Sequence, residues 1–498
     1  MKTINKFKIF FLLSLSIITV GCDDFLDVNE SPNNPTLSNP SLTLPVAQAY
    51  YADINGTDMN YLGNYMVYNY SVPSNWSAQQ NLLRYNITTT FYDDIFETSF
   101  NQVFKNLNFI ANYEDGVIDY SAYKVIAKTL KGFQYQYLVD LYGDVPYSEA
   151  GLRGDNTAPA YDDAETIYKA TIDELTSAAT TALGLIGNTL YQDPDASDIM
   201  FGGDMTKWAQ FANTVKLRML IRLSNTGQDA YITGEISKIN ANGAGYITSD
   251  VNANPGYLNV ANKQNPFYAA YGKNDGGEFT DANDFTVASD YAIDYLVLTN
   301  DARYTRLYSE AVEGGYHGTE QITTLPGTGF TSDDVSHIGP GLLKASEQDQ
   351  PIMLVSESMF LQAEAIMRGY IAGGDAAAEV LYNSAIKESF TYLGVPDADN
   401  EAIAYYGQNL VNVSWASSTD KIQAIITQKW VALNGTNAIE SWIELTRTGF
   451  PNTLPIPVES NGSRPVRLLY PSSEIGRNSE NVPAQTKTDA FTSNPFWK

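Results

Sequence analysis

The sequence predicts a mostly α-helical protein in which helices form hairpins and alternate with long loops. Apolar residues recur at three- and four-residue steps, the period of an amphipathic helix, and residues 120–142 are the clearest case. Helical segments are paired across short breaks, as in 355–370 and 376–393, which a Gly-Gly pair separates. Two stretches, 244–285 and 314–350, are rich in Gly, Asn and Asp and predict loops. The pairs suggest hairpins of the tetratricopeptide kind, although no regular period of about 34 residues is present.

The segment 120–142 leads the chain into a tight loop. Its apolar positions, among them Leu130 and Leu141, lie on one face of a helix. Gly143 supplies a helix stop, and Pro146 prevents the helix from resuming at once. From the residues alone, we interpret this segment as a core helix followed by a turn.

The remaining helices are predicted from the same periodicity and from capping signals. Asp162, with Glu165 three residues further on, predicts a capping box, and Asp204 predicts another N-cap. The further predicted helices are 45–54, 59–70, 93–113, 163–183, 205–224, 228–240, 286–299, 302–312, 421–433 and 438–446. Residues 71–90 are predicted to be irregular, and the chain is predicted to be coil from Pro451 onward.

The N-terminus predicts an export signal. Basic residues precede the apolar run Ile9–Val20, which is too short to span a bilayer, so residues 1–21 are predicted to be a signal peptide. Cys22 is the only cysteine and follows Gly21, in an arrangement that resembles a lipobox with Thr19 where Leu is usual. We therefore predict that Cys22 is lipidated.

Residues 22–41 are predicted to be a tether between the lipid and the folded domain. Asn, Ser and Pro dominate residues 28–41, which favours an extended, flexible segment. An ordinary secretory signal followed by an unrelated Cys is the alternative interpretation. The rest of the chain, 42–498, is predicted to form one domain.

Composition narrows the possible functions. The chain has 498 residues, 44% of them apolar and 12% aromatic, enough for a large core. A net charge of −27 argues against a nucleic-acid partner. With two His and one Cys, a zinc site of the usual kind is not expected. The Asp-rich runs 193–198 and 275–284 offer oxygen donors for Ca²⁺, but neither matches an EF-hand loop, so an acidic surface is favoured and no cofactor is predicted.

Candidate ligand-binding residues lie in loops that combine aromatic rings with planar polar groups, the combination that suits a sugar ring and its hydroxyls. In the early loop these residues are Tyr68, Tyr70, Asn75, Trp76 and Arg84. A second group comprises Tyr271, Asp284, Phe285 and, in the next loop, Tyr316. Trp76 stands beside Pro, Ser and Asn outside any apolar period, which favours a ligand platform. Core packing is the alternative, and many of the tyrosines are expected to be core residues.

Three arginines lie on otherwise apolar predicted helices. Arg218, Arg222 and Arg447 therefore need buried acceptors. The candidate partners are Glu357, Glu364, Glu444 and Glu474. Trp430 and Trp442, on neighbouring helices, are predicted to be core residues rather than ligand platforms. These segments are thus predicted to form the scaffold, with the binding site elsewhere.

Five blocks of sequence occur in one order along the chain. They are 130–150 (LKGFQYQYLVDLYGDVPYSEA), 208–224 (WAQFANTVKLRMLIRLS), 351–369 (PIMLVSESMFLQAEAIMRG), 425–451 (IITQKWVALNGTNAIESWIELTRTGFP) and 467–478 (RLLYPSSEIGRN). In residue pattern and order they resemble the SusD/RagB family of bacterial outer-membrane nutrient-binding lipoproteins. The acidic residues Asp23, Asp24 and Asp27 also resemble the surface-export signal of Bacteroidetes lipoproteins. One departure is Thr446, where Arg is common in the family.

The resemblance implies a fold and a function. The fold would be tetratricopeptide-like helical hairpins packed against a loop-rich ligand-binding half. The protein would be a cell-surface lipoprotein of the outer membrane that binds an oligo- or polysaccharide. It would deliver this ligand to a SusC-like TonB-dependent transporter, without a cofactor and without catalysis of its own.

Two alternatives remain. A RagB-type member of the family would bind peptide or protein instead of glycan. A surface glycoside hydrolase would need only two carboxylates, but among 57 acidic residues a pair is no evidence. The sequence contains no G-x-S-x-G, H-E-x-x-H or P-loop pattern, which disfavours an enzyme.

Overall fold

Helices dominate the structure, a computed structural model of the chain. It describes residues 38–152, 156–322 and 327–498. Two units are distinguished, Met1–Asn39 and the compact unit Pro40–Lys498 that contains the described helices. Cys22 and the predicted signal peptide, 1–21, lie outside the described residues. Within the described ranges, no helix is both long and apolar enough to cross a membrane.

The first half of the compact unit contains the longest helices. They are α2 (Pro40–Ile54), α3 (Asn60–Met66), α4 (Gln80–Leu83), α5 (Asp94–Thr98), α6 (Lys105–Ala111), α7 (Ser121–Tyr142), α8 (Ala164–Leu185), α9 (Met205–Arg222) and α10 (Asp229–Asn242). The π-helical turn Asn55–Met59 joins α2 to α3, so the predicted break between two helices is wrong. A Cβ at Gly56 would lie 2.2 Å from the side-chain nitrogen of Gln350, so a larger residue there would displace the buried Gln350 side chain.

The second half alternates short helices with longer ones. They are α11 (Pro266–Tyr271), α12 (Asp281–Phe285), α13 (Asp290–Leu298), α14 (Tyr304–Leu307), α15 (Val355–Met367), α16 (Gly374–Leu393), α17 (Ala398–Tyr406), α18 (Lys421–Ala432), α19 (Ala438–Thr448), α20 (Ser472–Arg477) and α21 (Asp489–Thr492). The prediction missed α11 and α12, which lie in the predicted loop 244–285, and it also missed α17, α20 and α21. The predicted helix 302–312 is reduced to α14. The predicted helix 286–299 begins only at Asp290, because the Ser289 hydroxyl caps it by accepting from the Ala292 N–H.

Two small antiparallel ladders fasten the loops to the helices. Strand β1 (Tyr70–Ser71) pairs with β3 (Val287–Ala288), and Tyr70 lies opposite Ala288. Strand β2 (Val251–Ala253) pairs with β4 (Gln350–Met353). Each ladder joins segments that are far apart in the sequence, so the predicted loops are held in place.

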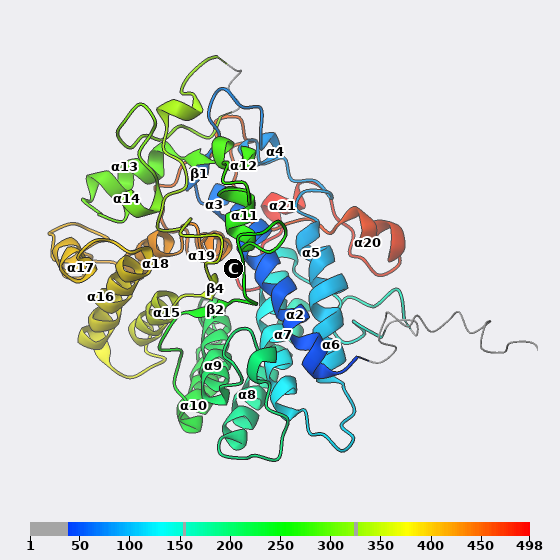
Figure 1. Cartoon of the computed structure of the whole chain (residues 1–498). Coiled ribbons are helices and arrows are strands. Elements are labelled where there is room, and N and C mark those ends of the chain that lie inside the picture. The colour runs from blue at the N-terminus through cyan, green and yellow to red at the C-terminus, as the bar shows by residue number, and fades with distance from the viewer. Residues whose placement is uncertain (1–37, 153–155, 323–326) are drawn as a thin grey trace, which may run out of the picture. The chain divides into compact units, whose positions relative to one another are not determined.

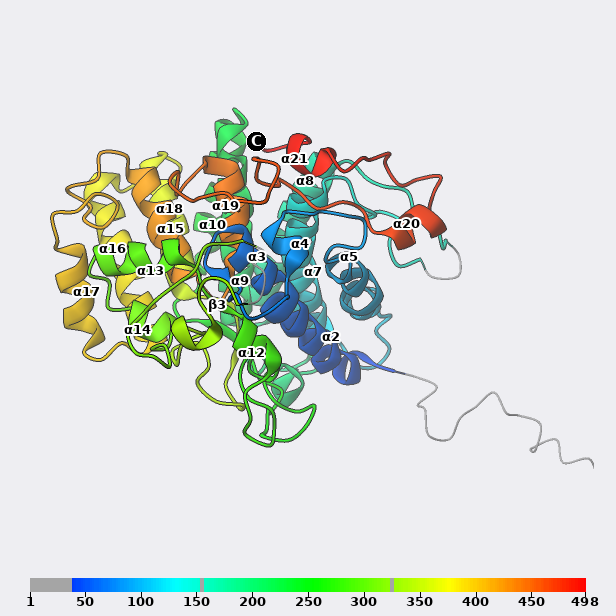
Figure 2. The same ribbon diagram turned by 90° about the horizontal axis from the view of Figure 1, so that it is seen from above.

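The helices are arranged on two sides of the unit. Figure 1 and Figure 2 show α15–α18 on one side and α2, α5, α7 and α8 on the other, with α3, α9 and α19 between them. Helix α8 packs against both α7 and α9, and α15 packs against α16 and α18. The short elements β1, α13 and α14 lie above the α15–α18 group in Figure 1. The predicted mostly α-helical fold with helical hairpins is confirmed.

Two predicted helix boundaries are confirmed. Helix α7 ends at Gly143, whose φ of +84° is a conformation that side chains disfavour. The hydroxyl of Tyr135 then donates to the carbonyl of Pro146 at 3.2 Å, which closes the loop onto the helix. The predicted cap Asp204 accepts from the backbone N–H of Thr206 at 2.9 Å.

The predicted cap of α8 is wrong by one residue. The side chain of Asp163, not Asp162, accepts from the Thr166 N–H at 2.9 Å. The Asp162 carboxylate instead accepts from the backbone N–H groups of Tyr147 and Ser148, each at 2.9 Å. Asp162 thus serves the loop after α7, a tertiary demand that local spacing does not reveal.

The predicted buried arginine partners are confirmed for three of the four glutamates. Arg218 lies 3.2 Å from Glu357, and Arg447 lies 2.8 Å from Glu364. Arg222 binds Glu444 as well, and all of these side chains are at most 2% exposed. The paired charges join α9, α15 and α19 through the core.

Glu474 is the wrong prediction, and three members of the cluster were missed. Glu474 lies on α20 instead of near the arginines of α9 and α19. Its carboxylate accepts from the hydroxyl of Tyr161 at 2.9 Å. Arg222 also contacts Asp140 at 3.1 Å and Glu440 at 2.6 Å, and Lys429 lies 2.9 Å from Glu440. We call this group, with the three ion pairs above, the buried charge cluster.

Candidate ligand-binding site

Trp76 is held by residues from a segment about two hundred positions away. Its indole N–H donates to the Asp284 carboxylate at 2.6 Å. Its ring packs edge-on against Phe285, with 5.6 Å between centroids. Trp76 and Phe285 are partly buried against the core. Three predicted ligand residues thus meet, although whether they bind ligand stays a prediction.

The loop that carries Trp76 is fixed to the turn at 330–334. Asn75 donates to the Ser332 hydroxyl at 3.1 Å and accepts from the Ser332 N–H at 2.9 Å. The Ser74 N–H donates to the Phe330 carbonyl at 2.7 Å. The exposed Asn75 side chain therefore positions the loop, and whether it also binds ligand stays a prediction.

A cavity of about 850 Å³ opens beside Asp284. Its lining includes Lys273, Phe279 and His337 together with carboxylates from three segments. Phe279 is 64% exposed, and the Lys273 ammonium lies 4.4 Å from the centre of its ring. We call the cavity with Trp76 and Phe285 the Trp76–Asp284 site.

A small hairpin presents Lys273 and Phe279 side by side. The Asn274 N–H donates to the Glu278 carbonyl at 2.9 Å, and Lys273 bridges to Phe279 across the turn. Gly277 takes a φ of +85°, which the tight turn requires. The sequence analysis missed both residues. The signal that could have found them is an apolar residue directly after the polar run K-N-D-G-G-E, where no core period continues.

His337 connects the two loops under the cavity. Its Nδ1 lies 2.9 Å from the Asn283 carbonyl oxygen, and its Nε2 lies 2.9 Å from the Ser332 carbonyl oxygen. The ring therefore ties α12 to the turn that holds Asn75.

Acidic groups outnumber basic ones in the cavity lining. Asp281, Asp284, Glu310 and Asp333 line it, whereas Lys273 is the only lysine or arginine among the described lining residues. This excess repels anions and suits neutral or cationic ligands. Carboxylates can also accept hydrogen bonds from hydroxyl groups.

Three of the predicted tyrosines lie in the core instead. Tyr70 is fully buried, Tyr68 is 2% exposed and Tyr271 is 8% exposed. The Tyr68 hydroxyl accepts from the Gln321 N–H, and Tyr271 stacks on Tyr61 with 4.6 Å between centroids. Burial raises the pKa of Tyr68 to about 12. The alternative interpretation, core packing, therefore describes these three rings.

The two other predicted residues lie apart from the cavity lining. Arg84 pairs with Glu459 at 2.9 Å on the surface. Tyr316 packs edge-on against Tyr304, with 4.7 Å between centroids. Of the nine predicted residues, Asp284 alone is among the described residues that line the cavity, whereas Trp76 and Phe285 reach it through their contacts with Asp284 and with each other.

The Asp-rich runs contain one buried carboxylate. Asp198 is 3% exposed and accepts from Gln48 and from the Trp208 indole, each at 2.7 Å. The favoured interpretation as an acidic surface is therefore wrong for Asp198, because it satisfies buried donors. Among the described residues, no group of three or more His, Cys, Asp or Glu is arranged to hold a metal ion.

Comparison with known proteins agrees with this architecture. Residues 32–471 match the family model described as "Starch-binding associating with outer membrane", SusD-like. A chitin-binding protein of known structure is 25% identical, with a TM-score of 0.72, over 89% of this chain and 95% of its own. No curated protein sequence matches the chain.

Two further solved structures have the same fold. A chitin-binding SusD homologue from Flavobacterium johnsoniae is 20% identical, with a TM-score of 0.72, over 91% of this chain and 98% of its own. A SusD homologue from Bacteroides vulgatus ATCC 8482 is 19% identical, with a TM-score of 0.73, over 89% and 93%. The chain belongs to the SusD-like family.

Proposed function

We propose that this SusD-like protein binds an oligo- or polysaccharide at the Trp76–Asp284 site and serves nutrient uptake. The observation that carries the proposal is the meeting of Trp76, Asp284 and Phe285 beside a loop-lined cavity. The family description and the names of the chitin-binding relatives support a carbohydrate ligand.

The geometry suits a neutral sugar. Aromatic faces pack against the apolar face of a pyranose ring, and the surrounding carboxylates accept from its hydroxyls. The Asp284 carboxylate fixes the Trp76 indole before any ligand arrives, so less conformational entropy is lost on binding. Affinity is expected to be weak to moderate, because each contact replaces a good contact with water.

Uptake would need a membrane anchor and a transporter. By its family resemblance, a lipid on Cys22 holds the protein at the outer membrane, on the cell surface. It then delivers ligand to a SusC-like TonB-dependent transporter and needs no cofactor or catalysis itself.

Peptide binding is the second candidate. The excess of carboxylates around the cavity favours a basic peptide as much as a neutral sugar. A surface glycoside hydrolase is the third, and release of reducing ends from a polysaccharide panel would reveal it.

Affinity electrophoresis tests the proposal directly. Native gels cast with starch, chitin derivatives, β-glucan or pectin should retard the mature protein with at least one of them. Trp76→Ala should weaken that interaction by at least about 30-fold, the loss typical of a central aromatic anchor, about 2 kcal/mol.

The matched control is Tyr406→Ala, which removes another partly buried aromatic ring, on α17. It should leave retardation unchanged. Equal retardation of the wild type and Trp76→Ala would contradict the proposed site, and binding of basic peptides alone would favour the second candidate. If Trp76→Ala unfolds the protein, Trp76 is a core residue.

A further inference from the structure

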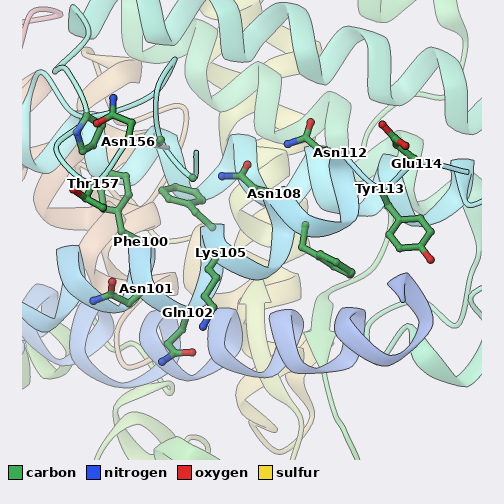
Figure 3. A pocket seen from close by; sticks show the side chains of 15 residues that line it. Phe100, Asn101, Gln102, Lys105, Asn108, Asn112, Tyr113, Glu114, Asn156 and Thr157 are labelled. Atoms are coloured by element: carbon green, nitrogen blue, oxygen red, sulfur yellow. The ribbon is translucent and has the colours of Figure 1, made fainter. Parts of the chain in front are cut away.

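A second cavity lies along α6, on a part of the chain that the proposed site does not use. Its volume is about 1010 Å³. One wall is formed by residues 100–114 and the other by the loop that contains Ala150, Gly151 and Asn156. Figure 3 shows Asn108 and Asn112 on the helix wall and Asn156 and Thr157 on the loop wall. We call it the α6 cavity.

Amide side chains and aromatic rings dominate this lining. The amides are Asn101, Gln102, Asn108, Asn112 and Asn156, and the rings include Phe100, Phe109 and Tyr113. One cation, Lys105, and one anion, Glu114, are the only charged side chains among the described lining residues. In contrast to the acidic cavity beside Asp284, the α6 cavity suits an uncharged ligand.

Asn108 carries an unused acceptor inside this cavity. The residue is 8% exposed, and its Oδ1 has no hydrogen-bond partner among the described residues. A buried polar atom without a partner is costly, and such atoms in native structures call for an explanation. A donor from a bound ligand would satisfy it.

The opposite wall is built to approach Asn108 closely. A Cβ on Gly151 would lie 2.6 Å from the Asn108 amide nitrogen, so a larger residue there would displace the Asn108 side chain. The φ of Gly151 is +86°, which also favours glycine. The close approach keeps the Asn108 amide uncovered by a side chain from residue 151, and Asn108 lines the cavity.

The described residues 156–160 of the loop wall are held by hydrogen bonds. Asn156 donates to Glu149 at 2.7 Å and accepts from the Ala158 N–H at 3.0 Å. Glu149 accepts in addition from the Ala160 N–H at 2.9 Å. By contrast, within the described chain no hydrogen bond involves the side chains of Asn101, Gln102 or Asn112, which also line the cavity.

The helix wall contains a π-helical turn. Ser99–Phe104 interrupts the α-helical path between α5 and α6, and Phe100, Asn101 and Gln102 of this turn line the cavity. Single π-helical turns are rare and occur frequently at functional sites. The wider turn changes which side chains face the cavity relative to a regular helix.

We propose that the α6 cavity is a second binding site, for a neutral oligosaccharide. Phe109 and Tyr113 offer ring faces, and the amides of Asn101, Asn108 and Asn112 offer paired donors and acceptors for neighbouring hydroxyls. Binding of a neutral peptide instead is an outcome of the test. Two sites on one protein would let a long polymer bind with higher apparent affinity than a short one.

The sugar class rests on the proposed function, whereas the location does not. The test is isothermal titration of the mature chain with short neutral oligosaccharides derived from starch, chitin and cellulose. Four proteins are compared: wild type, Trp76→Ala, Asn108→Leu and the double variant. Asn108→Leu keeps the side-chain size and removes only the polar atoms, so its thermal midpoint should equal or exceed that of the wild type.

The wild type should bind two equivalents of one sugar. Trp76→Ala should leave one equivalent, Asn108→Leu should weaken the other by tenfold or more, and the double variant should not bind. Should Asn108→Leu prove unstable, Asn112→Ala replaces it with the same expectation, because Asn112 is exposed and its side chain makes no hydrogen bond within the described chain.

The outcomes separate the two proposals. A single equivalent that Trp76→Ala removes overturns the α6 site and leaves the proposed function intact. A single equivalent that only Asn108→Leu removes supports the α6 site and overturns the Trp76–Asp284 site. No sugar binding by the wild type, or binding of neutral peptides alone, overturns the α6 site as an oligosaccharide site.

Discussion

Around α9 and α19 the charged side chains are buried and paired, whereas around α12 the carboxylates line an open cavity. Arg222 in the first region contacts Asp140, Glu440 and Glu444. Asp284 in the second region has one indole partner and borders solvent. The first region fixes how helices meet, and the second leaves its polar groups available to a ligand.

The difference explains why the family is easier to recognise than the ligand. A buried guanidinium without an acceptor would cost several kcal/mol, so its presence on an apolar helix demands partners. Those demands produce the sequence blocks around Arg218, Arg222 and Arg447. A loop that meets water has no such demand, and many residue types satisfy it equally well.

The largest expected effect comes from breaking the buried charge cluster. Arg222→Met leaves three carboxylates without their shared cation and should lower the free energy of unfolding by about 3–5 kcal/mol. Urea unfolding followed by circular dichroism measures it. A loss below about 1 kcal/mol would mean that the cluster does not stabilise the helix contacts as described.

The second-largest effect is expected at acid pH, where the buried charge cluster should contribute less to stability. Burial alone would raise the pKa of Glu364 and Glu444, but Arg447 and the neighbouring cations outweigh it and hold both values below the usual 4.5. A depressed folded-state pKa stabilises above the unfolded value and is lost as pH falls through the folded value. Stability should therefore drop below about pH 4.5.

Asp140 acts in the opposite direction. Burial raises its pKa to about 6 in spite of Arg222, so ionised Asp140 opposes folding at neutral pH. Its contribution improves as pH falls from about 6 toward the unfolded value of 3.8. The urea concentration at the unfolding midpoint should therefore be highest on the acid side of neutral pH. In Asp140→Asn this improvement should disappear, while the loss at lower pH remains.

Substitutions in the open region around α12 should change the affinity for glycan rather than the stability of the protein. Asp284→Ala removes the acceptor that holds the Trp76 indole and should weaken glycan binding by about tenfold, or about 1.4 kcal/mol. Asp284→Asn keeps an oxygen acceptor and should lose less. Titration calorimetry of both variants measures the difference, and equal losses would indicate that the charge itself contacts the ligand.

The smallest effect is expected at the surface. Arg84→Met, the same substitution as at Arg222, breaks the pair with Glu459, in which the Arg84 side chain is 48% exposed. Exposed pairs contribute little, so the free energy of unfolding should fall by less than about 1 kcal/mol. Urea unfolding beside Arg222→Met gives a matched comparison, and similar losses would remove the distinction between the regions.

The long helices could be predicted from sequence because their apolar period is local. The strands β1 and β3 could not, since two residues at 70–71 pair with two at 287–288 and carry no alternation of their own. Asp162 was assigned to the wrong role because its carboxylate binds a loop whose position depends on α7.

The candidate site was predicted in part. Trp76, Asp284 and Phe285 were chosen for residue type and loop context, but their contact could not be predicted across such a separation. Tyr70 and Tyr271 shared the same residue type and loop context and lie in the core, because a tyrosine serves a core and a sugar equally well.

Side-chain contacts of Asn75 and His337 connect three loops into one structural unit. The bonds from Asn75 to Ser332, and from His337 to Asn283 and Ser332, mean that none of the loops can shift alone. Grafting a single loop from a relative would transfer its side chains without the residues of the other loops that position them. A change of ligand preference in this scaffold thus requires exchanging all three connected loops at once, or substituting single side chains on them while the connecting contacts are kept.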